Sequence, residues 1–300
     1  MTANSERPAD APYRGILMMC FAVACFAAMN GFAKELRIQD LPVVEIIWGR
    51  YFFHTLLVLA LFPRRIPTLL AGSDKALQIA RSILVLLATG CMFTAVGLMP
   101  LADAVAITFI APLLITALSV PFLGERVGIR RWIAVFVGFA GMLVIVRPGG
   151  GLFQTAALLP IGVTVFYASY QIITRLISHR TNPINTVFYT AIVGGIGLSF
   201  VVPFFWQTPS LEQWGMLFAA GLLGGLGHWA IIIAYRRAEA PIVAPFAYTE
   251  LIWATILGLV VFQDFPDGWT FVGAAIIAGS GIYILQRERV RQVQKLELLG

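Results

Sequence analysis

The stretch "PLADAVAITFIAPLLITALSVPFLGERVGIRRWIAVFVGFAGMLVIV", Pro100–Val146, defines the architecture because the chain contains it twice. The second copy is "EAPIVAPFAYTELIWATILGLVVFQDFPDGWTFVGAAIIAGSGIYIL", Glu239–Leu285, and it places Asp264 opposite Glu125. Each copy holds two apolar runs that are long enough to cross a membrane as helices, joined by an acidic turn. The chain therefore repeats a pair of membrane-spanning segments.

The repeat extends upstream of these two copies. "LPVVEIIWGRYFFH", Leu41–His54, aligns with "NPINTVFYTAIVGG", Asn182–Gly195, and sets Pro42 against Pro183. Apolar segments of membrane-spanning length are predicted at 14–33, 43–62, 78–97, 101–122, 129–146, 153–174, 185–206, 213–235, 241–262 and 269–285. These ten segments form two halves of five, and because five is odd the second half must enter the membrane from the opposite face. We predict an all-α integral membrane protein with ten transmembrane helices in two inverted five-helix repeats.

Composition supports this class. The 300 residues are 59% hydrophobic and 12% charged, against about 25% charged in a soluble domain. The predicted organisation is a cytoplasmic lead at 1–13, repeats at 14–147 and 153–286, and a basic tail at 287–300. The lead lacks the charged region of a cleaved signal. The three cysteines lack metal-ligand spacing, so no metal or cofactor is expected.

Charge placement predicts the orientation. With the N-terminus assigned to the cytoplasm, 17 of the 21 Lys and Arg residues, Arg81 among them, fall on the inner side. Lys34, Arg37 and Arg147 fall outside, and Arg50 lies within a span. The positive-inside rule then places both termini in the cytoplasm of a multi-pass inner-membrane protein. Because the basic residues are spread over alternate connections, a nucleic-acid partner is not expected.

The two copies resemble the EamA unit of the drug/metabolite transporter superfamily. The resemblance rests on "GERVGIRRWIAVFVGFAGMLVIV", on "WGRYFF" and on "GAAIIAGSGIYIL". It implies ten helices and gradient-coupled or exchange transport of small metabolites, with helices five and ten as peripheral scaffold. Their glycines, Gly138 with Gly141 and Gly279 with Gly281, would then be packing seams. "PLADAVAITFIAPLL", "FYTAIVGG" and "APFAYTELIWATILG" are most similar to RibN-type riboflavin transporters of bacteria.

Three ionisable residues inside the spans are candidates for substrate binding or coupling. Arg50 and His54 share one helix face, and Glu250 lies near mid-depth in its span. Charges at this depth are costly and are functional candidates. Glu250 is the natural partner for Arg50 or His54, and the pair could be a structural lock, a proton-coupling site or part of solute recognition. Neither Arg50 nor Glu250 recurs in the other repeat. Glu45, near the outer end of its span, is expected to be structural, either snorkelling to the interface or meeting Lys34 or Arg37.

Further polar or amphipathic side chains in apolar spans could join the site. They are Asn30, Tyr167, Tyr170, Gln171, His228, Trp229 and Thr249. Aromatic rings around a polar cluster would suit a flat heteroaromatic solute through stacking. The alternative is that each ring serves core packing or an interfacial belt. Pro112 and Pro245 are expected to kink their spans, and Gly221 with Gly225 to allow close helix packing.

The predicted function is secondary transport of a small metabolite, with riboflavin or a similar heteroaromatic vitamin as the first substrate. Amino acids, nucleosides or S-adenosylmethionine are the alternatives, by import or export. Partners are the solute, the lipid bilayer and either protons or an exchanged solute, and the sequence leaves a homodimer open. A channel is a rival class. An intramembrane enzyme is disfavoured, because the chain contains neither H-E-x-x-H nor G-x-S-x-G.

Overall fold

A computed structural model describes residues 11–61, 63, 74–125, 127–147, 152–177, 180, 181, 183–238 and 240–297. The predicted lead and tail extend beyond the described residues. The regular elements of this part of the chain are all helices: α1 Ala11–Ile38, α2 Val43–Leu61, α4 Lys75–Val96, α5 Leu101–Thr108, α6 Ala111–Leu123, α7 Ile129–Val146, α8 Leu152–Ile177, α9 Pro183–Ser199, η2 Val202–Phe205, α10 Leu211–Arg237, α11 Ala240–Val243, η3 Ala244–Thr249, α12 Glu250–Phe262 and α13 Gly268–Glu297. Each of the ten predicted segments is helical, so the predicted all-α membrane fold is confirmed.

Eight spans of the described residues are long and apolar enough to cross a membrane. The helices of the two other predicted spans are shorter than the 18 residues that those eight reach. Helix α9 has 17 residues, and the apolar part of α13 is Gly268–Ile284. The predicted segment 185–206 is too long, because the α-helix ends at Ser199 and a short 3₁₀ turn, Val202–Phe205, follows. Pro203, the second residue of that turn, has no backbone N–H with which to continue the helix.

The fourth span of each repeat is broken. In the first repeat the break lies at Phe109 and Ile110, before Pro112 in the first turn of α6. In the second repeat Pro245 lies in the 3₁₀ helix η3 that precedes α12. The predicted kinks are therefore confirmed. Phe109 and Tyr248 occupy the same place in the two aligned copies, and their rings meet edge to face with centroids 5.0 Å apart. The two repeats thus meet at equivalent positions of their broken helices.

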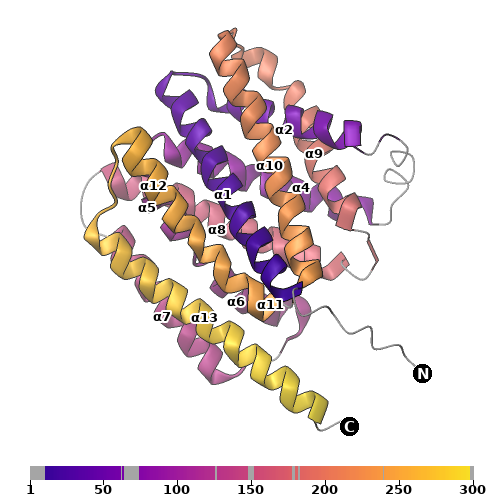
Figure 1. The fold of residues 1–300 in the computed structure, drawn as a ribbon, viewed down its shortest axis with the longest axis vertical. Coiled ribbons are helices and arrows are strands. Elements are labelled where there is room, and N and C mark those ends of the chain that lie inside the picture. Colours follow the sequence, from indigo (N-terminus) through magenta and orange to yellow (C-terminus); the bar gives the residue numbers. More distant parts are fainter. Residues whose placement is uncertain are drawn as a thin grey trace.

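The repeats interleave. The first helix of one repeat packs along the third helix of the other, which pairs α1 with α10 and α8 with α4. Helices that occupy the same place in both repeats also pack together, α2 with α9 and α7 with α13. Figure 1 shows α1 beside α10 across the middle of the molecule and α7 beside α13 along one edge. Polar residues of both repeats are thereby brought to one interior region.

The α7–α13 edge is built on glycine. A Cβ atom at Gly273 would lie 2.5 Å from the Gly141 carbonyl oxygen, and one at Gly138 would lie 1.8 Å from Leu113 Cδ1. A Cβ atom at Gly281 would lie 1.9 Å from Tyr248 Oη, whereas one at Gly279 would meet nothing within 4 Å. The close α7–α13 crossing therefore uses Gly273, which the sequence did not indicate, and not Gly279.

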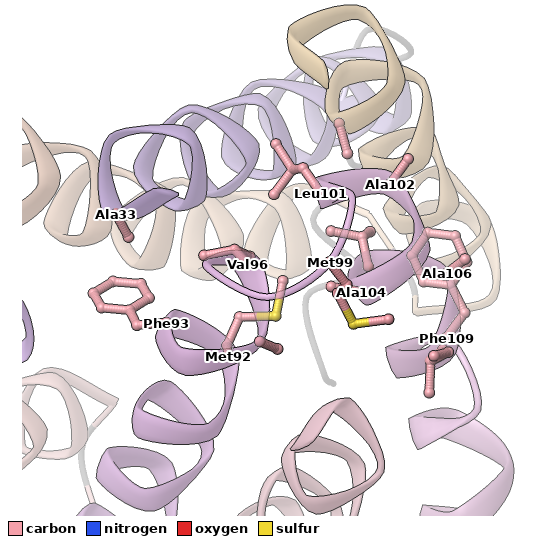
Figure 2. Close-up of a cluster of buried hydrophobic side chains, with 14 of the residues drawn as sticks. Ala33, Met92, Phe93, Val96, Met99, Leu101, Ala102, Ala104, Ala106 and Phe109 are labelled. Carbon is pink, nitrogen blue, oxygen red and sulfur yellow. The ribbon is translucent and has the colours of Figure 1, made fainter. Parts of the chain in front are cut away.

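The largest apolar core joins the end of α4, the α4–α5 turn and α5 to α1. Figure 2 shows Phe93 and Val96 near Ala33 of α1, with Met99 and Leu101 continuing the cluster into α5. Val96, Leu101 and Ala33 are 0% exposed, so this end of the molecule is tightly packed.

Candidate functional site

Small residues on α10 bring α2 close enough to place its polar side chains beside α10. A Cβ atom at Gly221 would lie 2.5 Å from Phe53 Cβ and 3.0 Å from the Arg50 carbonyl oxygen. At Gly225 it would lie 2.8 Å from Leu57 and 3.1 Å from the His54 ring. The close packing predicted for Gly221 and Gly225 is confirmed. It sets the Arg50–His54 turn of α2 directly against α10.

Arg50 is buried, with 3% of its surface exposed, about 10 Å along α2 from its first residue. Its Nη1 donates a hydrogen bond to Thr89 Oγ1 at 2.8 Å, and its Nε lies 3.1 Å from Met29 Sδ. The guanidinium carbon lies 4.5 Å from the centre of the Tyr51 ring. Arg50 thus rests on neutral groups, and no carboxylate of the described chain pairs with it.

His54 and His228 stack on each other between α2 and α10. Their ring centroids are 6.0 Å apart and their planes differ by 8°. Within the described residues, neither nitrogen of His54 has a hydrogen-bond partner, and the same is true of His228 Nε2. Asn30 of α1 is also buried, with an unpaired Oδ1. Buried polar atoms without partners are uncommon and require an explanation, such as a ligand or water.

A second buried arginine, Arg81 of α4, belongs to the same region. It is 0% exposed, and its guanidinium carbon lies 4.6 Å from the centre of the Tyr170 ring. The guanidinium donates three hydrogen bonds: to Thr174 Oγ1 at 3.0 Å, to Gln78 Oε1 at 2.9 Å and to the Thr186 carbonyl at 3.0 Å. Its charge, like that of Arg50, acts on His228. The sequence counted Arg81 only as one of the inner-side charges, and the structure shows that this residue is buried. Its place inside the apolar segment 78–97 was the signal that could have found it.

Tyr167, Tyr170 and Gln171 contact one another on one side of α8, as their spacing in the sequence predicts. The rings of Tyr167 and Tyr170 are 5.6 Å apart, and Gln171 Nε2 donates to Tyr167 Oη at 3.2 Å. Tyr167 lies within electrostatic range of Glu250 and Tyr235. The α8 group therefore links the Arg81 side of the region to the start of α12.

Glu250 begins α12 and is partly buried. It forms no ion pair with Arg50 or His54, so the expected pairing is not present in this structure. The physical reason is that Arg50 is engaged by Thr89 on α4. Thr249, the preceding residue, donates to the Phe246 carbonyl at 2.6 Å and lies 4.0 Å from Cys20 Sγ.

Trp229 and Glu45 lie away from the polar region around Arg50 and His228. Trp229 is 51% exposed on the outward side of α10, so the structure does not bring it to the polar region. Glu45 is 0% exposed and accepts a hydrogen bond from the Gln207 backbone at 3.1 Å. The expected contact of Glu45 with Lys34 or Arg37 is wrong, because Lys34 pairs with Asp264 and Arg37 donates to the Leu41 carbonyl.

A hollow of about 440 Å³ lies between α7 and α13, lined mainly by apolar side chains such as Ile133, Val137 and Ile276. The hollow belongs to the α7–α13 helix pair and shares no residue with the polar region.

We define the polar cluster as Arg50, His54, Arg81, Tyr167, Tyr170, His228 and Glu250, drawn from α2, α4, α8, α10 and α12.

An inverted repeat with broken helices and a polar cluster between its halves defines the class of secondary transporters. Comparison with known proteins agrees. The EamA-like transporter family matches residues 13–147 and 154–286, so the chain belongs to that family.

Individual relatives cover most of the chain. A riboflavin transporter of Vibrio cholerae is 31% identical over 92% of this chain and 94% of that protein. An S-adenosylmethionine uptake transporter of Rickettsia bellii is 27% identical over 84% of this chain and 87% of that protein. A solved structure described as a crystal structure of protein matches the fold with a TM-score of 0.62 at 17% identity, over 93% of this chain and 99% of that one.

Proposed function

We propose that this protein carries riboflavin, or a solute with a similar flat heteroaromatic ring, across the bacterial inner membrane by alternating access. The observation that carries the proposal is the 31% identity, over 92% of the chain, to a protein named as a riboflavin transporter. The polar cluster supplies the chemistry that such a solute needs.

The chemical support has two parts. Tyr167 and Tyr170 form one aromatic pair, and His54 with His228 forms another, so flat rings are available on both sides of the cluster for stacking. Arg50 and Arg81 rest on neutral partners, which leaves their charge available to the carbonyl oxygens of a heteroaromatic ring. Solute recognition is therefore assigned to these residues, with Asn30, Gln171 and Thr249 in supporting positions.

A second candidate solute is S-adenosylmethionine, the substrate named for the 27% identical relative. The observation that favours it is Glu250, a carboxylate inside a span to which no described cation is paired. A sulfonium or ammonium group would bind such a carboxylate. Measuring thermal stabilisation of the purified protein by riboflavin and by S-adenosylmethionine distinguishes the two solutes.

Glu250 is also the residue that we propose for proton coupling. Carboxyl groups inside membrane spans are functional candidates, and proton relays are one of their roles. Glu250→Gln, which cannot exchange a proton, is then expected to retain solute binding while uptake loses its dependence on an imposed proton gradient. Gradient-dependent uptake by this variant would assign coupling elsewhere.

The proposed orientation places both termini in the cytoplasm. With the buried Lys34, Arg50 and Arg81 set aside, sixteen Lys and Arg residues lie on the proposed inner side and two, Arg37 and Arg147, on the outer side. This imbalance supports the orientation by the positive-inside rule.

The decisive test is uptake of radiolabelled riboflavin into proteoliposomes. Arg50→Ala and Glu250→Ala are expected to abolish uptake while the protein remains in the membrane, and Trp229→Ala, outside the polar cluster, is the control expected to transport normally. Wild-type uptake by both cluster variants would remove Arg50 and Glu250 from the site. Preloading with unlabelled riboflavin should produce transient counterflow, which a channel does not show.

A further inference from the structure

Two ion pairs each join one repeat to the other. Lys34 Nζ of α1 pairs with Asp264, in the turn that follows α12. Arg175 Nη2, near the end of α8, lies 3.3 Å from Glu125 Oε1, in the turn that follows α6. In each pair the cation belongs to the first helix of one repeat and the acid follows the fourth span of the other.

The internal repeat relates the two pairs. Glu125 and Asp264 are set opposite each other by the alignment of the two long copies. Lys34 and Arg175 are matched by the alignment that sets Pro42 against Pro183, because each cation precedes its proline by the same number of positions. The two ion pairs are therefore equivalent positions of an inverted repeat, which places one pair near each face of the membrane.

The backbone presents both acids in the same way. The residues before them, Gly124 and Gln263, adopt left-handed conformations with φ of 66° and 54°. The N–H of Glu125 donates to the Ser119 carbonyl at 3.3 Å, and the N–H of Asp264 donates to the Gly258 carbonyl at 2.9 Å. This is a Schellman-type helix end in both repeats. Gln263 adopts a conformation that non-glycine residues rarely take, so the turn is kept even without glycine.

The surroundings of the two pairs differ. The Lys34 side chain is 8% exposed and also donates to the Met99 carbonyl, beside the apolar cluster that Figure 2 shows around Val96, Met99 and Leu101. A second ion pair at the same end, Arg147 with Asp267, also joins the first repeat to the second. Asp267 accepts from the Trp269 backbone N–H and from Arg147, and both interactions lower the pKa of its carboxyl group. Asp267 therefore stays charged at neutral pH.

The Arg175 end is more open to solvent. The Arg175 side chain is 50% exposed and that of Glu125 is 38% exposed. Exposed ion pairs contribute little to stability and are screened by salt. The conformation described here thus holds the Lys34 end more firmly than the Arg175 end.

We propose that the Lys34–Asp264 and Arg175–Glu125 pairs are the two latches of the transport cycle, each closing one face of the polar cluster. The face at the Lys34 end opens when the Lys34–Asp264 latch breaks while the Arg175–Glu125 latch holds, and the reverse opens the other face. The proposal rests on the proposed carrier function, since it assumes two alternating states.

The test measures the two faces separately in the full chain without solute. In a background with Cys20, Cys25 and Cys91 replaced by serine, nitroxide labels are placed at the exposed positions 38 and 265 for one face, and at the exposed positions 122 and 176 for the other. Double electron–electron resonance in nanodiscs gives the distance distribution across each face. Lys34→Gln is expected to raise the long-distance population at 38–265 at least twofold and to lower it at 122–176. Arg175→Gln is expected to do the opposite.

Glu35→Gln is the matched control, because Glu35 neighbours Lys34 but, among the described residues, its side chain bonds only to Gln39 at the end of its own helix. Charge reversal in both partners, Lys34→Asp with Asp264→Lys, should restore the wild-type distributions. Should Lys34→Gln fail to reach the membrane, Asp264→Asn breaks the same latch. Unchanged distributions, or opening of both faces together in either variant, would overturn the proposal. Because no solute is present, this result is independent of whether riboflavin is the substrate.

Discussion

At the scale of single residues, the polar cluster depends on buried arginines that have neutral partners. Thr89 accepts from Arg50 Nη1 at 2.8 Å, lies 3.1 Å from Tyr51 Oη and donates to the Val85 carbonyl. Thr89→Val keeps the shape but removes the acceptor, and an unpaired buried donor costs about 1–3 kcal/mol. We expect a lower melting temperature in detergent and reduced uptake for Thr89→Val, and near-normal values for Thr89→Ser. Equal behaviour of the two variants would mean that Thr89 does not hold Arg50.

Arg81 is the second buried arginine with neutral partners, and here the planar guanidinium itself is expected to matter. Its guanidinium reaches Thr174, Gln78 and the Thr186 carbonyl from α4 and lies against the Tyr170 ring. A lysine cannot reproduce this planar, multiple donation. Arg81→Lys is therefore expected to lose most uptake, whereas Arg237→Lys, on the exposed end of α10, should transport normally. Full uptake by Arg81→Lys would show that only the charge matters.

At the scale of helices, the glycines of α10 set the position of α2. Gly221→Ala would place a methyl group 2.5 Å from Phe53 Cβ and push α2 away, at a cost of about 1–3 kcal/mol for overpacking. Gly215→Ala, on the same helix, meets nothing within 4 Å and should be neutral or stabilising by up to about 1 kcal/mol. Melting temperatures and uptake of the two variants check this difference. A loss in Gly215→Ala equal to that in Gly221→Ala would contradict it.

The α7–α13 crossing gives a second comparison between helices. Gly273→Ala would bring a methyl group within 2.5 Å of the Gly141 carbonyl, while Gly279→Ala meets nothing within 4 Å. We expect Gly273→Ala to lower the melting temperature and Gly279→Ala to leave it unchanged or higher. Because the sequence shows glycines but not which way they face, the resemblance indicated Gly279 and missed Gly273.

At the scale of the whole molecule, the repeat predicted the architecture and much of the polar cluster. Apolar length and internal similarity are properties of the chain itself, so ten helical segments, the broken fourth spans and the inward glycines of α10 could be predicted. The partners of the charges could not, because they depend on how the repeats interleave. Arg50 meets Thr89 rather than Glu250, Lys34 meets Asp264 rather than Glu45, and Arg81 is buried, with Thr174, Gln78 and the Thr186 carbonyl as partners.

The proposed transport mechanism requires two oppositely oriented repeats that enclose the polar cluster. Side-specific cysteine labelling measures directly which face of the membrane each repeat's turn occupies. In the cysteine-free background, Ile129→Cys and Phe265→Cys introduce single exposed thiols beside equivalent turns of the two repeats. A membrane-impermeant maleimide added to intact cells should label position 265 from outside and reach position 129 only after the membrane is opened. Labelling of both positions from the same side would refute the inverted arrangement.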